Sequence, residues 1–179
     1  MSEVHSRGEK PEFLLWVGSA GAFDDRYKKV TREFVKILHH FKVSYAVLGT
    51  EETDSGDVAR RSGNEMLFQM QALMNIELFK MYEVKKILTC CPHDYNTFKN
   101  EYPGLGLECE VIHHSQLLAE LVQGSKFKMQ NQLKTKDLGL KTVFHDPCYL
   151  GRANGEYEAP RKVLTALGLD LTEMKRSKS

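Results

Sequence analysis

Side chains that bind metals or carry out thiol chemistry are concentrated just after short apolar runs of this 179-residue chain. They follow the runs at 85–89, 108–112 and 141–144, and they are Cys90, Cys91, His93 and Asp94, then His113 and His114, then His145 and Cys148. Thiolates and imidazoles are preferred ligands of zinc, and thiolates also hold iron–sulfur clusters. These positions therefore predict a metal or thiol site, if the fold brings them together.

The apolar runs alternate with amphipathic stretches, a pattern typical of an α/β fold. We expect strands at 13–17, 44–49, 85–89, 108–112 and 141–144, with a sixth at 169–174. Helices between them give a three-layer Rossmann-like domain with a mainly parallel sheet of five or six strands. Ligands of such sheets bind beyond the carboxyl ends of the strands, so the residues above are expected at one edge with Ser19 and Asp54. The alternative is that these loops are polar only because strand-end loops generally are.

The segment 64–83 predicts a long helix that is apolar on almost every side. Its large apolar residues are too many for one stripe: Met66, Leu67, Phe68, Met70, Leu73, Met74, Ile76, Leu78, Phe79 and Tyr82. We therefore expect this helix to be largely buried, in the core or in the contact of a homo-oligomer. A methionine-rich binding surface is the alternative.

Composition limits the classes of function. The 25 basic and 24 acidic residues leave a net charge of +1, which argues against nucleic-acid binding, and the basic stretch at 124–139 has Phe127 as its one aromatic residue. No apolar run approaches the ~20 residues that cross a bilayer. The first twelve residues lack the hydrophobic segment of a signal peptide. We expect a cytoplasmic protein whose four cysteines are thiols or metal ligands, with a flexible arm at 1–12 and a single domain at 13–179.

Five strings of the sequence resemble one family. They are WVGSAGAFDDR from Trp16, NEMLFQMQ from Asn64, the segment from Thr89 to Pro103, TVFHDPCYLGR from Thr142, and EYEAPRKVL from Glu156. The chain is similar from about Phe13 onward to the cysteine-rich, CCG-type domain found in heterodisulfide reductase, in its B-type and D-type components, and in related iron–sulfur oxidoreductases. The resemblance implies an electron-transfer function and a redox or flavoprotein partner subunit, with membrane contact only through a partner.

The same resemblance implies which residues occupy the ligand positions of the family. The first motif falls on Ser19, Asp54, Cys91 and Asp94, with spacings of 35 and 37 residues between the first three. Only Cys91 keeps a thiol, so the set is mostly of oxygen donors, which suit iron–sulfur clusters poorly. Cys148 matches the opening of a second motif, which is truncated. Auxiliary ligands are expected among Cys90, His93, His113 and His145.

The sequence therefore predicts a partial, degenerate member of the family, with no cofactor in this chain although relatives hold an iron–sulfur cluster. Zinc held by the oxygen and nitrogen donors is an alternative. So is a structural or interaction protein without redox chemistry. Nucleotide binding is disfavoured because no GxGxxG follows the first expected strand. Arg161 is expected to be solvated.

Overall fold

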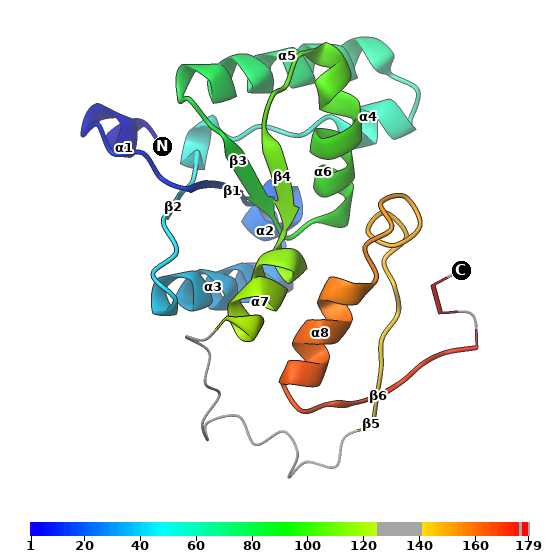
Figure 1. Ribbon diagram of the computed structural model, residues 1–179. Helices are drawn as coiled ribbons and strands as arrows, with labels where there is room; N and C mark the ends of the chain where they lie inside the picture. The colour runs from blue at the N-terminus through cyan, green and yellow to red at the C-terminus, as the bar shows by residue number, and fades with distance from the viewer. Residues whose placement is uncertain (125–140, 176, 179) are drawn as a thin grey trace. The chain divides into compact units, whose positions relative to one another are not determined.

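The computed structural model describes residues 1–124, 141–175, 177 and 178, so the basic stretch at 124–139 lies outside the described residues apart from Gly124. The chain forms two compact units, Met1–His113 and His114–Ser179 (Figure 1). The arm that precedes the first strand contains a short helix, α1 (Ser2–Ser6). A single domain at 13–179 and flexibility of the arm stay predictions.

The first unit is built on a parallel sheet of four strands in the order β2-β1-β3-β4. The strands are β1 (Phe13–Trp16), β2 (Tyr45–Ala46), β3 (Lys86–Thr89) and β4 (Glu110–His113). Leu14 of β1 is in register with Ile87 of β3, and both are buried. The parallel order confirms the predicted α/β class.

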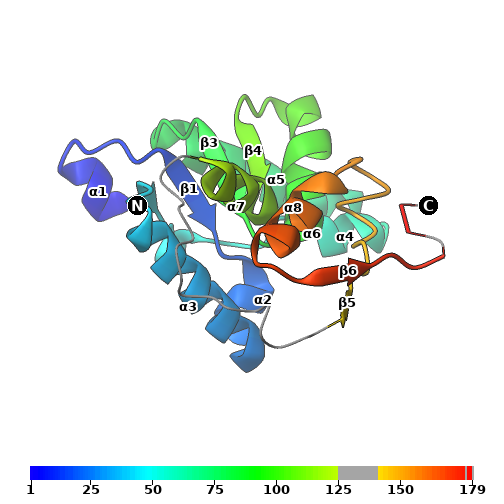
Figure 2. The same ribbon diagram turned by 60° about the horizontal axis from the view of Figure 1, so that its bottom comes forward.

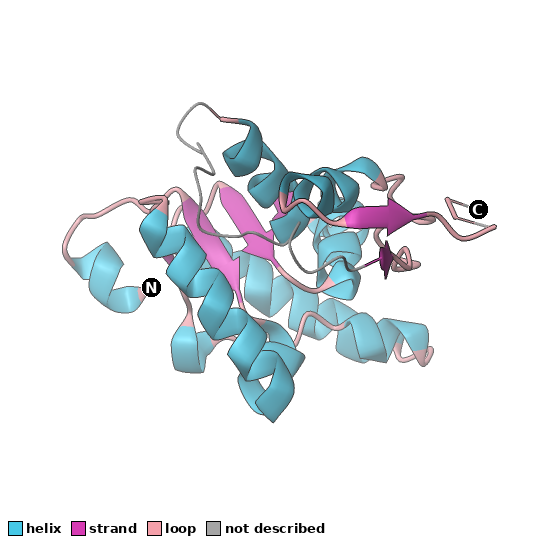
Figure 3. Cartoon of the chain, turned by 90° about the horizontal axis from the view of Figure 1, so that it is seen from below, coloured by secondary structure: helices cyan, strands magenta, loops and turns pink. Residues whose placement is uncertain are grey.

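The expected five or six strands do not form one sheet. The fifth and sixth, β5 (Lys141–Val143) and β6 (Asp170–Thr172), pair in parallel as a separate sheet in the second unit (Figure 3). Each has three residues, of which only the middle one is partly covered. They therefore lack the two apolar faces that an inner strand of a parallel sheet presents.

Two long helices cover opposite faces of the four-stranded sheet and give the first unit its three layers (Figure 2). The α3 helix (Asp25–His40) begins at Asp24, whose side chain accepts a hydrogen bond from the amide of Tyr27, and it buries Phe34 and Leu38. The α5 helix (Glu65–Met81) lies against the other face. There the ring of Trp16 from β1 meets Phe79 of α5 and Phe98, with ring centroids 6.0 and 4.9 Å apart.

The prediction that the helix at 64–83 is largely buried is wrong, although the helix itself is confirmed. Asn64 caps it by accepting a hydrogen bond from the amide of Leu67. One stripe is buried, formed by Phe68, Ala72, Asn75, Ile76 and Phe79. That stripe suffices to cover the sheet, so the opposite face keeps its methionines in solvent.

Short helices follow the strands and form the rim of the first unit. They are α2 (Gly18–Phe23), η1 (Gly49–Glu51), α4 (Asp57–Arg61), α6 (Pro92–Asn96), η2 (Thr97–Glu101) and η3 (Tyr102–Leu105). None of the helices in the described ranges is long and apolar enough to cross a membrane.

The second unit packs α7 (His114–Gln123) against α8 (Glu158–Ala166). The guanidinium group of Arg161 lies between two carboxylates, with nitrogen–oxygen distances of 2.6 and 2.9 Å to Asp146 and the same two distances to Glu173. Its side chain is only 9% exposed, so the expectation that Arg161 is solvated is wrong. The fork-shaped guanidinium fits two carboxylates at once, and this pairing offsets its burial.

Candidate functional site

The loops that follow β1, β2 and β3 line one cavity of about 600 Å³. Its wall contains Ser19, Asp54, Cys91 and Asp94, the four positions that the sequence analysis assigned to the first ligand motif. The carboxyl ends of parallel strands meet at one edge, and this explains why residues so far apart in the sequence meet here. Their role as metal ligands stays a prediction.

Cys91 is the residue that precedes α6, and it helps to line the cavity. Its amide donates a 3.1 Å hydrogen bond to the hydroxyl oxygen of Thr89. The amides of His93 and Asp94 donate to its sulfur, but burial dominates and, with the nearby charge of Asp94, raises the pKa of the Cys91 thiol to about 11. Cys91 is therefore a protonated thiol at neutral pH and a poor nucleophile.

Asp94 is a buried carboxyl group in the wall of the cavity, with 8% of the residue exposed. Ser55 donates a 2.6 Å hydrogen bond to Oδ1, and the thiol of Cys91 also bonds to this carboxyl group. Burial raises the pKa of Asp94, the charges of Asp54 and Asp57 raise it further, and the two hydrogen bonds oppose the shift. Within the predicted ligand set, the thiol of Cys91 is thus already bonded to Asp94. The negative charge of Asp54 disfavours a negative charge on Asp94.

Gly18 allows β1 to approach this carboxyl group closely. A Cβ at position 18 would lie 2.8 Å from Oδ2 of Asp94, and the φ of Gly18 is +72°, a left-handed conformation that favours glycine. The structure therefore explains the glycine of the Val17-Gly18-Ser19 turn by contact with Asp94.

Glu52 is a site residue that the sequence analysis missed. Its carboxylate accepts hydrogen bonds from the amides of Val17 (3.1 Å) and Gly18 (2.7 Å), which join the loop after β2 to the turn after β1. Burial raises the pKa of Glu52 to about 7, the charge of Asp94 adds to the shift, and the two amides oppose it. An acidic residue two positions before Asp54 was the only signal in the sequence.

Tyr27 and His113 hold the carbonyl group of Cys90 from two sides. The hydroxyl group of Tyr27 donates at 3.2 Å, and Nε2 of His113 lies 3.3 Å from the same oxygen. Burial raises the pKa of the Cys90 thiol to about 12. Of the expected auxiliary residues, His113 is therefore a buried group that contacts the backbone before Cys91, and Cys90 has a buried thiol.

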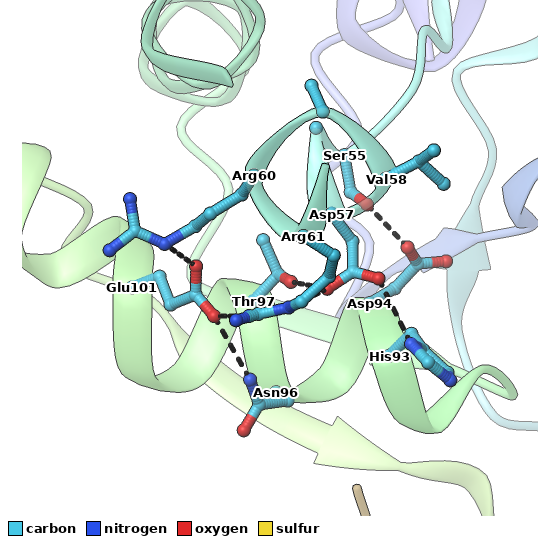
Figure 4. A network of polar contacts seen from close by, with 12 residues as sticks. Ser55, Asp57, Val58, Arg60, Arg61, His93, Asp94, Asn96, Thr97 and Glu101 are labelled. Atoms are coloured by element: carbon cyan, nitrogen blue, oxygen red, sulfur yellow. Dashed lines mark hydrogen bonds and ion pairs between the residues drawn. The ribbon is translucent and has the colours of Figure 1, made fainter. Parts of the chain in front are cut away.

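A network of polar contacts fastens α4 to α6 and η2 beside the cavity (Figure 4). Asp57 lies 3.0 Å from Nδ1 of His93 and accepts hydrogen bonds from Thr97 and Arg61, each at 3.1 Å. Arg61 also pairs with Glu101. His93, another expected auxiliary ligand, is thus paired with Asp57 and half exposed.

The remaining predicted residues, His145 and Cys148, belong to the second unit. They lie in the loop after β5, where His145 and Cys148 are both exposed. The carbonyl group of Cys148 accepts a 3.1 Å hydrogen bond from the amide of Ala153, which fixes the loop, and its thiol is free.

The residues of the cavity do not fit a four-iron cluster. Such a cluster is normally held by four thiolates, and the four positions supply one thiol, two carboxyl groups and a hydroxyl group. Within the described ranges, no group of three or more His, Cys, Asp or Glu side chains is arranged to hold a metal ion. What the arrangement does is bind the three loops to one another through hydrogen bonds.

Comparison with known proteins shows which family the chain resembles. The cysteine-rich domain family matches residues 16–99 and 142–179. The chain is 48% identical over 179 residues to "Probable iron-sulfur-binding oxidoreductase FadF" of Bacillus subtilis, covering 99% of this chain and 25% of that protein. It is 47% identical over 171 residues to "EtfAB:quinone oxidoreductase" of Syntrophomonas wolfei, covering 96% of this chain and 23% of that protein.

A more distant relative is one subunit of the dihydromethanophenazine:CoB–CoM heterodisulfide reductase of Methanosarcina barkeri. It is 34% identical over 150 residues, covering 80% of this chain and 36% of that protein. The chain thus spans about a quarter of the length of the first two relatives and about a third of this one. No solved structure matches the chain.

Proposed function

The chain belongs to the cysteine-rich domain family, and its relatives are electron-transfer iron–sulfur oxidoreductases; on this premise we propose that it is a half-module of such a protein. In this proposal the cavity of the first unit holds no cluster. The first unit instead acts as a scaffold that docks on a redox or flavoprotein partner subunit. Catalysis belongs to the assembly and not to this chain alone.

The observation that supports an empty first site is the hydrogen bonding of Asp94. A ligand must offer free lone pairs to a metal ion, and a cysteine ligand must lose its proton. Here the four positions supply a single thiol, and the carboxyl group of Asp94 accepts hydrogen bonds from Ser55 and Cys91. The same hydrogen bonds join the loops that a cluster would otherwise join.

Cys148 is the thiol best placed for a role outside the chain. It is exposed and free, and it opens the second motif implied by the family resemblance. We propose that its thiolate completes a cluster whose other ligands come from beyond this sequence. The names of two relatives describe them as subunits, which supports a role within a larger assembly.

The proposal is tested by preparing the protein without oxygen and measuring bound iron, acid-labile sulfide and zinc. Iron–sulfur clusters absorb broadly near ~400 nm through charge transfer from thiolate to iron. We expect the unaltered chain to be colourless, with less than one tenth of an equivalent of each metal. Cys91→Ser should leave the metal content unchanged.

Two results would contradict the proposal that the cavity holds no metal. A stoichiometric cluster that is lost in Cys91→Ser would show that the cavity is a working cluster site. One equivalent of zinc that is lost in both Cys91→Ser and Asp54→Ala would favour the zinc alternative. A cytoplasmic location is part of the same proposal and is tested separately by fractionating cells that produce the protein.

A further inference from the structure

The short helix α4 forms part of the wall of the cavity, through Asp57, Val58 and Arg61. Of its five residues, Asp57 and Ala59 are buried, whereas Val58 is 71% exposed. The buried apolar part of α4 is therefore one methyl group, which contributes little to holding the helix in place. An element with so little apolar burial opens at a lower free energy than the core does.

Charged contacts hold α4 in place, and they converge on Glu101 of η2 (Figure 4). The carboxylate of Glu101 pairs with both Arg60 and Arg61, and it accepts a 3.2 Å hydrogen bond from Asn96. The side chain of Glu101 is only 12% exposed, so salt screens these pairs less than it screens pairs at the surface. One carboxylate thus connects two consecutive arginines of α4 to the neighbouring helix.

Glycines with left-handed backbone lie on both sides of α4. The φ angles of Gly56 and Gly63 are +80° and +83°. A Cβ at Gly63 would meet no atom within 4 Å, so the backbone conformation, and not close packing, explains the glycine there. Few residues need to change their backbone angles for a segment to move as a hinged unit, and glycine permits such changes at low cost.

We propose that α4 is a lid of the cavity, hinged at Gly56 and Gly63 and held shut by the pairing of Arg60 and Arg61 with Glu101. Opening of the lid removes this part of the cavity wall and exposes the interior to larger molecules. An isolated helix of five residues is unstable in water, so opening also unwinds α4. The inference goes beyond the function proposed above, and it does not depend on whether the cavity holds a metal.

Native-state hydrogen exchange measures the opening. The amides of Arg60, Ser62 and Asn64 are its reporters, because each donates a hydrogen bond of 2.8–3.0 Å to a carbonyl group within 56–59. In the unaltered chain, we expect their protection factors to be at least tenfold lower than those of the most protected amides of β1 and β3. Their exchange should also respond little to low concentrations of urea, because opening of the lid exposes little surface. Equal protection and equal urea dependence in α4 and the two strands would overturn the lid.

Glu101→Gln keeps the shape of the side chain and removes the charge that attracts the two arginines. This variant should lower the protection factors of the α4 amides at least fivefold. Glu65→Gln is the matched control, since Glu65 is the exposed partner of Arg60, with 55% of its side chain exposed, and it should change them less than twofold. The same response to both variants would overturn the role of Glu101.

Thiol labelling connects the opening to the cavity. Cys91 lines the cavity and is partly covered, so a bulky maleimide should reach it more readily when the lid is open. In a Cys148→Ser background, Glu101→Gln should accelerate this labelling at least fivefold, whereas Glu65→Gln should leave the rate unchanged. Cys91→Ser in the same background measures the reaction of the other thiols. Equal rates in Glu101→Gln and the parent would show that α4 does not control access to the cavity, and would overturn the proposal.

Discussion

The hydroxyl group of Ser55 donates a 2.6 Å hydrogen bond to the buried carboxyl group of Asp94. This contact joins the loop after β2 to the loop after β3, across the cavity that the family resemblance identifies with a cluster. Both side chains are less than 10% exposed as residues, so water does not replace the bond if it is lost. Removing this contact therefore tests how much the hydrogen bonding between the two loops contributes to the stability of the fold.

Replacing Ser55 with alanine should lower the free energy of unfolding by about 1.5–3 kcal/mol, the range for a hydrogen bond to a charged or strongly polar partner. The reason is that the Asp94 carboxyl group stays buried without its donor. Urea denaturation followed by circular dichroism measures the change. Ser62→Ala serves as the control, because the Ser62 hydroxyl group bonds to helix carbonyl groups at the surface and should cost less than about 0.5 kcal/mol. Equal losses in the two variants would contradict the prediction.

Glu52 should make the stability depend on pH between about 4.5 and 7. Burial raises its folded pKa to about 7, above its ordinary value of 4.5, so the folded chain holds a proton that the unfolded chain has already released. The contribution of Glu52 is therefore fully present below pH 4.5 and is lost as the pH rises through 7. The loss should be on the order of 3 kcal/mol, from a shift of this size at about 1.4 kcal/mol for each unit.

Glu52→Gln is the comparison, because glutamine does not titrate. The Glu52 carboxylate accepts from Val17 at Oε2 and from Gly18 at Oε1, and glutamine keeps one of these two acceptors, so the test compares the pH dependence of the two proteins and not their absolute stability. Urea denaturation at pH 5, 6, 7 and 8 should show a fall in stability for the unaltered chain that is absent in the variant. Parallel curves for the two proteins would mean that Glu52 titrates in its ordinary range.

Two residues of α5 should respond differently to truncation. Phe68 is 1% exposed and packs in the core, so Phe68→Ala should cost about 3–5 kcal/mol. Leu73 is 47% exposed, so Leu73→Ala should cost less than about 1 kcal/mol. The measurement is urea denaturation at low micromolar concentration. Similar losses at both positions would mean that both faces of α5 are buried.

The contrast within α5 also shows how far the sequence predicts this structure. The strand–helix alternation and the aligned ends of β1, β2 and β3 follow from local patterns, so the class of fold and the meeting of Ser19, Asp54, Cys91 and Asp94 were predictable. The exposure of Met70 was not, because hydropathy alone does not tell which apolar face of a helix meets the sheet. Glu52 was missed because its role depends on the Val17 and Gly18 amides, which come from another strand end.

The pairing of Arg161 was missed for the same reason. Asp146 and Glu173 lie 15 and 12 residues from it in the sequence, on separate elements. Likewise, nothing in the pattern separates β5 and β6 from the main sheet, since three-residue strands with apolar residues are common in both settings. The sequence therefore predicts the helices and strands themselves but not the contacts between them.

Restoring thiolates to the cavity should recover metal binding. Ser19→Cys, Asp54→Cys and Asp94→Cys together with Cys91 place four thiols around one cavity, and thiolates bind iron and zinc more tightly than hydroxyl or carboxyl groups do at such sites. The triple variant should take up an iron–sulfur cluster on anaerobic reconstitution, or about one equivalent of zinc, while the unaltered chain should take up neither. Metal analysis and absorbance near ~400 nm measure the uptake.

The control with alanine at the same three positions loses the same hydrogen bonds without gaining ligands, and it should bind no metal. A folded triple variant without metal would show that the loops do not hold ligand geometry, whereas a cluster in the unaltered chain would show that Cys90 or a histidine is a working ligand.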